Sequence, residues 1–242
     1  MILIFLILFG PEQAWTSSEN FSIPLDALDE RGREKVEDLL KGHTLERSPS
    51  QEHPIVNREL HQFLLDRPDV GAGISRALGI GDYTVTREGK DVFHASDPAG
   101  IEGNLEILYR DEARRVYFAE GYAEGALLTV RGKTLVAQQS QYWTTDQGQE
   151  WVRSDLTIYA KIKNPLLALF LKIFAPLLND LVDSKLSKAQ GVVQQVNEAM
   201  VQDPQETYRR IAESDQLPVE DLQTLRKLMN LPDRSTSRGE PS

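Results

Sequence analysis

The sequence predicts an α+β fold in which an antiparallel meander sheet wraps around a long C-terminal helix, with small helices on the N-terminal side. Three observations lead to this prediction. Hydrophobic residues recur at helical spacing before residue 80, and their period changes to two between Tyr83 and Ile162. Short turn-rich segments separate the strand-like runs, which favours an antiparallel meander. The longest helix-compatible run, Asn164 to Gln202, follows the last strand and is apolar over its first half.

The composition allows a sizeable core and excludes several classes of function. The chain has 242 residues, of which 40% are hydrophobic and 26% are charged, as in ordinary globular proteins. Its net charge of −10 argues against a general nucleic-acid binder, which needs a basic face to neutralise phosphates. The absence of cysteine rules out disulfides, thiolate nucleophiles and Cys-ligated metals.

The N-terminus carries an uncharged apolar run, ILIFLILFG, at residues 2–10. Nine helical residues rise about 14 Å, too little to cross a bilayer core of about 30 Å. The run suits the apolar region of a secretory signal, with cleavage before Glu19 after three small residues. No Lys or Arg precedes it, so a membrane anchor or a buried segment is the alternative. We therefore expect residues 1–18 to be a signal peptide or anchor and the protein to be periplasmic or secreted, or membrane-associated.

Residues 19–54 read as a linker with one helix, because leucine and valine recur at helical spacing until Gly42. The polar stretch 43–54 predicts a loop, in which Thr44 to Glu46 could supply one short strand. Two further short helices are expected between residues 55 and 80, separated by Pro68, which breaks a helix.

Six or so strands follow, and the last of them, Trp151 to Ile162, alternates apolar and polar residues throughout. A sheet with one apolar face needs a cover. Turn signals separate the strands at residues 97–100, 110–113, 131–133 and 146–148.

The expected cover is the long helix, with Asn164 as N-cap and Pro165 as its first residue. Pro176 should kink the helix near its middle. The first half is either a wall or lid of a cavity or a buried core helix, and the second half is an amphipathic helix. A short helical extension at residues 203–232 and a disordered tail at residues 233–242 complete the prediction.

Small helices, an antiparallel meander and one long C-terminal helix follow the element order of the helix-grip superfamily. The stretch Gly100 to Ile162, followed by NPLLALFLKIFAPLLNDLVDSKL, carries the resemblance, which covers residues 55–202. The chain thus resembles START-like lipid-transfer domains and polyketide cyclase-like proteins. This resemblance implies a curved sheet that wraps the last helix, with a cavity between the two. The superfamily usually opens with a strand, and no clear strand precedes Ile55 here.

These features predict a non-catalytic binding or carrier protein for a lipid-like or other hydrophobic ligand held between sheet and C-terminal helix. Its partners would be that ligand and, transiently, a membrane. Aromatic residues along the strands would line such a cavity, although ordinary sheet packing explains them as well. The candidate ligand-binding residues are Tyr109, Phe118, Glu120, Tyr122, Trp143, Ile158, Phe170, Phe174, Leu177 and Leu181.

Two other functions remain open. An enzyme of cyclase or hydrolase type on the same scaffold would use Glu120 or a tyrosine, if Glu120 points inward and pairs with Arg131 or Arg153. A membrane-associated structural protein would lay residues 166–178 in a bilayer interface. No HExxH, GxSxG or P-loop motif occurs, so no catalytic residue, metal or cofactor is expected. Structural or surface roles are expected for the four histidines, which lack metal-ligand spacing: His43, His53, His61 and His94.

Overall fold

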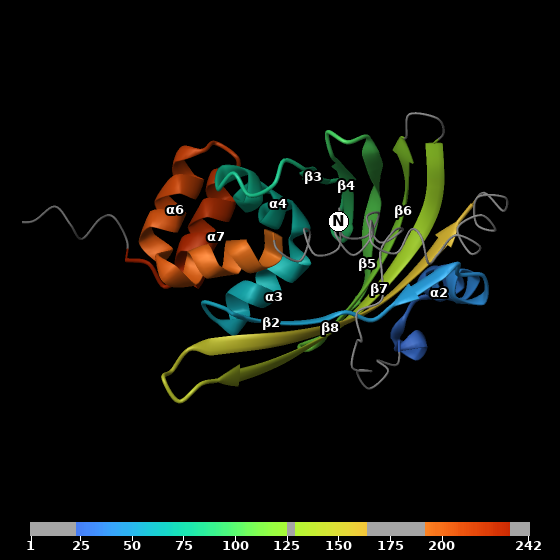
Figure 1. The fold of residues 1–242 in the computed structure, drawn as a ribbon, viewed down its shortest axis with the longest axis horizontal. Helices are drawn as coiled ribbons and strands as arrows, with labels where there is room; N and C mark the ends of the chain where they lie inside the picture. The colour runs from blue at the N-terminus through green and yellow to red at the C-terminus, as the bar shows by residue number, and fades with distance from the viewer. Residues whose placement is uncertain (1–22, 125–128, 164–191, 233–242) are drawn as a thin grey trace, which may run out of the picture.

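The computed structural model describes residues 23–124, 129–163 and 192–232. Eight strands form one antiparallel sheet in the order β1-β8-β7-β6-β5-β4-β3, with β2 also paired to β8. The sheet is strongly curved, and most of the helices gather at one end of it (Figure 1). The predicted α+β class and the antiparallel arrangement are therefore confirmed.

Six strands of the sheet form the predicted meander. β4, β5 and β8 alternate buried and more exposed residues over part of their length, because successive side chains point to opposite faces of a sheet. β6 and β7 each contain five consecutive buried residues, because both of their faces are covered there. The turn before β5 uses Gly100 at φ +82°, where Asp97 accepts a hydrogen bond from the Ile101 backbone N–H at 2.9 Å. The strands are β3 (Thr84–Arg87), β4 (Val92–Ser96), β5 (Ile101–Arg110), β6 (Arg114–Glu124), β7 (Thr129–Thr144) and β8 (Glu150–Ile162).

The stretch predicted as a loop forms two strands, β1 (Leu45–Arg47) and β2 (Ser50–Pro54), that lie along the outer edge of β8. The short strand expected as an alternative at Thr44 to Glu46 is present as β1, whereas the loop expected over the rest of this stretch is wrong because β2 forms there, so the sheet begins well before residue 55. Neither strand has an apolar pattern. Each is formed because β8 offers unpaired backbone groups at its edge, which β1 and β2 satisfy.

The turn predicted at residues 131–133 is also wrong, since these residues lie within β7. Gly132 pairs with Gly121 of β6 and Ile162 of β8. A Cβ atom at Gly132 would lie 3.1 Å from the carbonyl oxygen of Lys161. The glycine thus marks a close approach of strands rather than a change of chain direction.

Helix α2 (Glu30–Lys41) covers one face of the sheet, here called the outer face. It begins at Asp29, whose side chain accepts a hydrogen bond from the Gly32 N–H at 2.7 Å, and it ends at Gly42 as predicted. Val36 and Leu39 are fully buried against the sheet. Preceding it is a short 3-10 helix, η2 (Leu25–Ala27).

The remaining helices form a second core at one end of the sheet (Figure 1). They include the two short helices predicted before residue 80; Arg67 lies between them, and Pro68 is the first residue of the second. The helices are α3 (Arg58–Asp66), α4 (Pro68–Ala77), the helical segment 192–202, α6 (Pro204–Glu213) and α7 (Val219–Leu228). Met200, Ile211 and Leu225 are fully buried together with residues of α4. Residues 203–232 therefore belong to this helical core and are not a peripheral extension.

The first part of the long predicted helix, residues 164–191, lies outside the described residues, and so do residues 1–18 and the tail. Within the described ranges, no helix is both long and apolar enough to cross a membrane.

Candidate functional site

The candidate residues on the strands divide between the two faces of the sheet. Tyr117 of β6 pairs with Val136 of β7, and Val136 pairs with Ile158 of β8, so these three side chains share the inner face. Phe118 is offset by one residue and packs under α2 on the outer face. Phe118 and Ile158 therefore cannot line the same cavity.

Tyr109, Glu120 and Tyr122 also lie on the outer face. The Tyr109 hydroxyl donates to Asp111 at 2.8 Å, and the Tyr122 hydroxyl donates to Glu102 at 2.6 Å. Glu120 is solvent-exposed and forms an ion pair with Lys163, not with Arg131 or Arg153. The interpretation of Glu120 as an inward-facing acid is therefore wrong.

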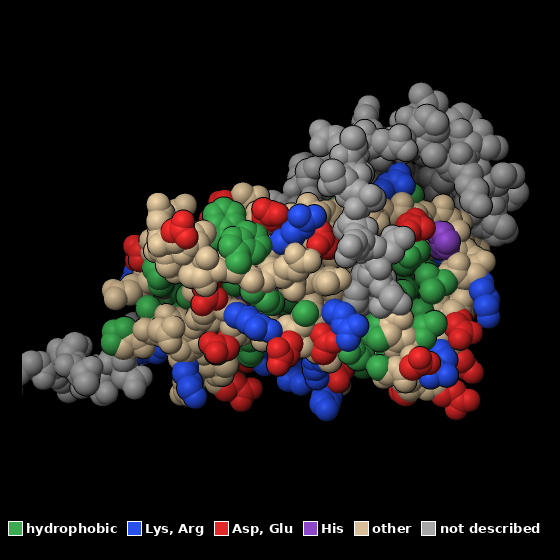
Figure 2. Space-filling view, turned by 90° about the horizontal axis from the view of Figure 1, so that it is seen from below, with side chains coloured by type: hydrophobic (Ala, Val, Ile, Leu, Met, Phe, Trp, Pro, Cys, Tyr) green, Lys and Arg blue, Asp and Glu red, His purple; other side chains and the backbone are tan. Residues whose placement is uncertain are grey.

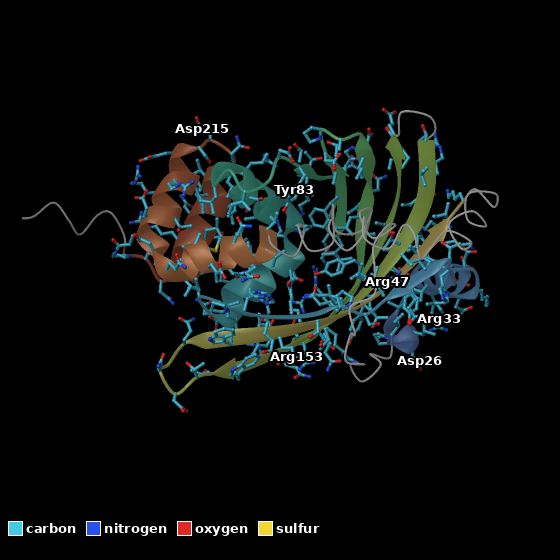
Figure 3. The ribbon with its side chains drawn as sticks, in the orientation of Figure 1. Asp26, Arg33, Arg47, Tyr83, Arg153 and Asp215 are labelled. Atoms are coloured by element: carbon cyan, nitrogen blue, oxygen red, sulfur yellow. The ribbon has the colours of Figure 1, made fainter. Side chains whose placement is uncertain are left out.

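Trp143 lies on the outer face near the turn between β7 and β8, where it is 39% exposed. It stacks on Trp151 across the two strands, with ring centroids 6.2 Å apart. Arg153 projects from the same side of β8, away from the helical core (Figure 3). The candidates Phe170, Phe174, Leu177 and Leu181 lie outside the described residues.

Charged residues tie α2 to the outer face. Asp38 accepts hydrogen bonds from Lys161 at 2.8 Å and Lys133 at 3.1 Å, and these bonds lower the pKa of its carboxyl group. Lys35 pairs with Glu106 of β5. Acidic and basic side chains are interspersed over the surface seen from below (Figure 2). The outer face thus consists of a helix-covered core and ion pairs, and it has a structural role.

The inner face is apolar over most of its area. Its buried side chains come from six neighbouring strands and pack into one cluster. Ile158 belongs to this cluster and is fully buried. The cluster includes Val85, Phe93, Ala95, Leu105, Ile107, Tyr117, Ala119, Val136, Leu156 and Ile158.

Towards the helical core, the inner face becomes polar. The polar side chains at this end come from neighbouring strands and are brought together by the strand register. Arg115 pairs with Gln138, Ser140 pairs with Ser154, and Val152 pairs with both His53 and Tyr142. All except Tyr142 are buried. We call the following residues the inner polar patch: His53, His61, Arg115, Gln138, Ser140, Tyr142 and Ser154.

His53 is the unusual member of the inner polar patch. Only 2% of its surface is exposed, and neither ring nitrogen has a hydrogen-bond partner. Burial lowers the pKa of His53 to about 4, against an opposing effect of the Glu198 charge. The imidazole is therefore neutral at pH 7, with one N–H donor and one nitrogen acceptor unused.

His61 of α3 lies beside it, with the two ring centroids 6.0 Å apart. Nδ1 of His61 shares a hydrogen bond of 3.0 Å with the Tyr142 hydroxyl. Burial, together with the charges of His53 and Arg115, lowers the pKa of His61 to about 3. Burial also raises the pKa of Tyr142, so this pair is uncharged at pH 7.

Arg115 is the buried cation of the patch, and its guanidinium is already engaged. Its Nε donates to Asp66 at 2.8 Å, and its Nη1 donates to the backbone oxygens of Asp111 and Arg114. The Tyr117 hydroxyl donates to the Leu65 backbone oxygen at 3.1 Å. These bonds hold α3 on the inner face, where Arg115 and Asp66 neutralise each other.

Sequence reasoning missed this patch because its members come from β2, α3, β6, β7 and β8. The available signal was the period of two in β7, which puts Gln138, Ser140 and Tyr142 on the same face as Val136. Polar residues on an otherwise apolar face indicate a buried polar site. In the part of the chain that the structure describes, no group of three metal-ligating side chains occurs.

Comparisons with known proteins return solved structures of low identity. No family model and no curated protein matches the sequence. A hypothetical protein from Helicobacter pylori is 13% identical, with 76% of this chain and 98% of that chain covered and a TM-score of 0.43. Norcoclaurine synthase from Thalictrum flavum is 12% identical (79% and 99% covered, TM-score 0.39) and Ara h 8.0201 is 13% identical (66% and 100% covered, TM-score 0.41). The last two belong to the helix-grip superfamily. At these identities and TM-scores, none of them assigns a ligand or an activity to this chain.

Proposed function

We propose that this chain is a non-catalytic binding or carrier protein whose lipid-like or other hydrophobic ligand lies against the inner face of the sheet. The observation that supports this function best is the composition of that face. Apolar side chains such as Ile158 and Val136 cover most of it, and a buried polar patch closes one end. Ligand sites combine a largely apolar lining with a few polar groups that fix orientation.

An enzyme on the same scaffold is the second candidate, favoured by the hydrogen bond between His61 and Tyr142. A buried histidine and tyrosine in contact could transfer a proton. A general base works best when its pKa is near the working pH, however, and the pKa of His61 is about 3. Binding is therefore the better supported function.

Export of the protein is part of the proposal and rests on the apolar run at residues 2–10. Mass spectrometry of the protein recovered from its native host tests it: a mature chain that begins at Glu19 is expected. Retention of residues 1–18 together with flotation on liposomes would instead favour the membrane-anchored form.

The binding function is tested by native mass spectrometry of the full chain, followed by solvent extraction of any bound molecule. We expect a bound hydrophobic molecule, or saturable binding of the fluorescent probe N-phenylnaphthylamine. Two alanines provide a matched pair of variants, since Ala119 is buried on the inner face and Ala137 on the outer face. Ala119→Leu should weaken probe binding, whereas Ala137→Leu should not, although both overpack a core at a cost of about 1–3 kcal/mol. No bound molecule and no probe binding would contradict the proposal.

A further inference from the structure

The strongest unexplained feature of the inner face is the unpartnered imidazole of His53. Most buried polar side chains in proteins have a hydrogen-bond partner, because an unpaired buried polar group costs about 1–3 kcal/mol. His53 is 98% buried (2% exposed), and both of its ring nitrogens lack a partner. It lies at the end of the apolar inner face, beside the His61–Tyr142 pair. This position suits a group that orients a ligand whose apolar part lies along the sheet.

We propose that the ligand carries an uncharged hydroxyl group, which His53 binds beside the His61–Tyr142 pair. This inference rests on the proposed function and names the chemical class of its ligand: a hydrophobic alcohol. A neutral imidazole presents one N–H donor and one nitrogen acceptor. A hydroxyl group can both donate and accept, so it matches either tautomer of His53. An ether or ester oxygen can only accept, and it matches only the donor nitrogen.

A carboxylate head group is disfavoured because both cations near the patch already have acidic partners. The Arg115 guanidinium donates to Asp66 and to two backbone oxygens. Arg58 lies over the Tyr142 ring at 5.0 Å, and Glu112 neutralises its charge, although its buried Nε has no hydrogen-bond partner. A buried anion without a partner costs several kcal/mol, which exceeds the gain from a hydrogen bond to neutral His53.

An ammonium head group is disfavoured by the same reasoning with opposite sign. Asp66 is the acidic partner of Arg115 and is neutralised by it. Glu198, whose charge acts on His53, is only half-buried and accepts a hydrogen bond from Gln194 at 2.7 Å, so solvent screens its attraction for a cation. The chemistry of the patch therefore selects a neutral head group over a charged one of either sign.

The test measures the affinity of the full chain for four molecules that share one decyl chain and differ only in head group. Decanol, decyl methyl ether, decanoate and decylamine each displace N-phenylnaphthylamine at pH 7.5. We expect decanol to bind about tenfold more tightly than each of the other three, because one additional satisfied hydrogen bond is worth about that factor. The imidazole resonances of His53 should shift more with decanol, which engages both ring nitrogens, than with decyl methyl ether, which engages only the donor nitrogen.

Two leucine variants connect the preference to His53. His53→Leu should abolish the tenfold preference for decanol over decyl methyl ether, because it removes both the bond that the two molecules share and the additional bond that only decanol makes. His94→Leu is the matched control, since His94 lies on the outer face and bonds to Asn104 at 2.9 Å. It should leave all four affinities unchanged. If His53→Leu does not fold, the ranking of the four molecules and the imidazole shifts in the natural chain still decide the question.

The outcomes separate the two proposals. If all four molecules bind equally well, or if decanoate or decylamine binds best, the hydroxyl inference is overturned and the binding function stands. Equal binding would mean that a buried water occupies the position beside His53. If none of the four binds and N-phenylnaphthylamine does not bind either, the proposed function fails and the inference fails with it.

Discussion

Acid should destabilise this protein through His53 and His61, and His53→Leu should remove part of that loss. The folded-state pKa values are about 4 for His53 and about 3 for His61, compared with 6.5 for an exposed histidine. As the pH falls below 6.5, the unfolded chain takes up protons on both histidines while the folded chain does not. The free energy of unfolding therefore falls with pH until the folded histidines are protonated themselves.

The size of the effect follows from these pKa values. Each pH unit between the unfolded and the folded pKa changes the free energy of unfolding by about 1.4 kcal/mol for each histidine. Half of the unfolded histidines are already protonated at pH 6.5, so between pH 6.5 and pH 4.5 the loss is about 2 kcal/mol for His53 alone and about 4 kcal/mol for both. A typical domain has only about 5–15 kcal/mol of stability, so this loss is large.

The assay is urea denaturation followed by tryptophan fluorescence, at pH 7.5 and at pH 4.5. We expect His53→Leu to lose about 2–3 kcal/mol less on acidification than the natural chain. Paired carboxylates such as Asp111, whose pKa is lowered by Arg114 and Tyr109, contribute equally to both proteins and cancel in the difference. His94→Leu should behave like the natural chain. The same acid loss in His53→Leu and in the natural chain would refute the assignment of a neutral, buried His53.

Three further predictions concern the fold. Ile211→Ala should lower the free energy of unfolding by about 2–5 kcal/mol, because Ile211 is fully buried in the helical core. Unfolding of this variant should remain a single transition, and a separate early transition would show that residues 203–232 fold independently. Gly103→Ala should lower the melting temperature, because a Cβ at this position would lie 2.7 Å from the Glu120 carbonyl oxygen. Its control, Gly71→Ala in α4, places the Cβ in open space and should raise the free energy of unfolding by about 0.5–1 kcal/mol. Equal effects of the two substitutions would contradict the close approach of β5 and β6. Glu120→Gln should change the free energy of unfolding and the free energy of probe binding by less than about 0.5–1 kcal/mol, because Glu120 forms only an exposed ion pair. A large loss of probe binding in this variant would show that Glu120 belongs to the binding site.

Much of the fold could be predicted because local patterns decide it. The period of two predicted the meander strands, and Gly42 and Pro68 marked ends of helices that the structure shows. Errors occurred where local pattern and tertiary pairing disagree. β1 and β2 are polar and contain no apolar alternation, yet they are strands because β8 offers them an edge. Residues 131–133 resemble a turn, yet Gly132 is needed where two strands approach each other closely.

The candidate site was harder to predict than the fold. Alternation shows that Phe118, Glu120 and Tyr122 share one face and that Tyr117 is on the other, but it does not show which face receives α2. A one-residue offset exchanges the faces, so the aromatic residues chosen as ligand contacts proved to lie under α2 or near solvent. Only Ile158, among the candidates that the structure describes, lies on the inner face.

The sequence by itself determined the α+β class and the order of the meander strands β3 to β8, because these follow from backbone geometry and residue periodicity within single segments. Only the tertiary structure decided which face of the sheet is the inner one. It also brought His53, His61 and Tyr142 together from β2, α3 and β7. Their proximity depends on strand register and helix docking across distant parts of the chain. Burial then keeps both imidazoles neutral, and that charge state underlies the proposed choice of an alcohol as ligand.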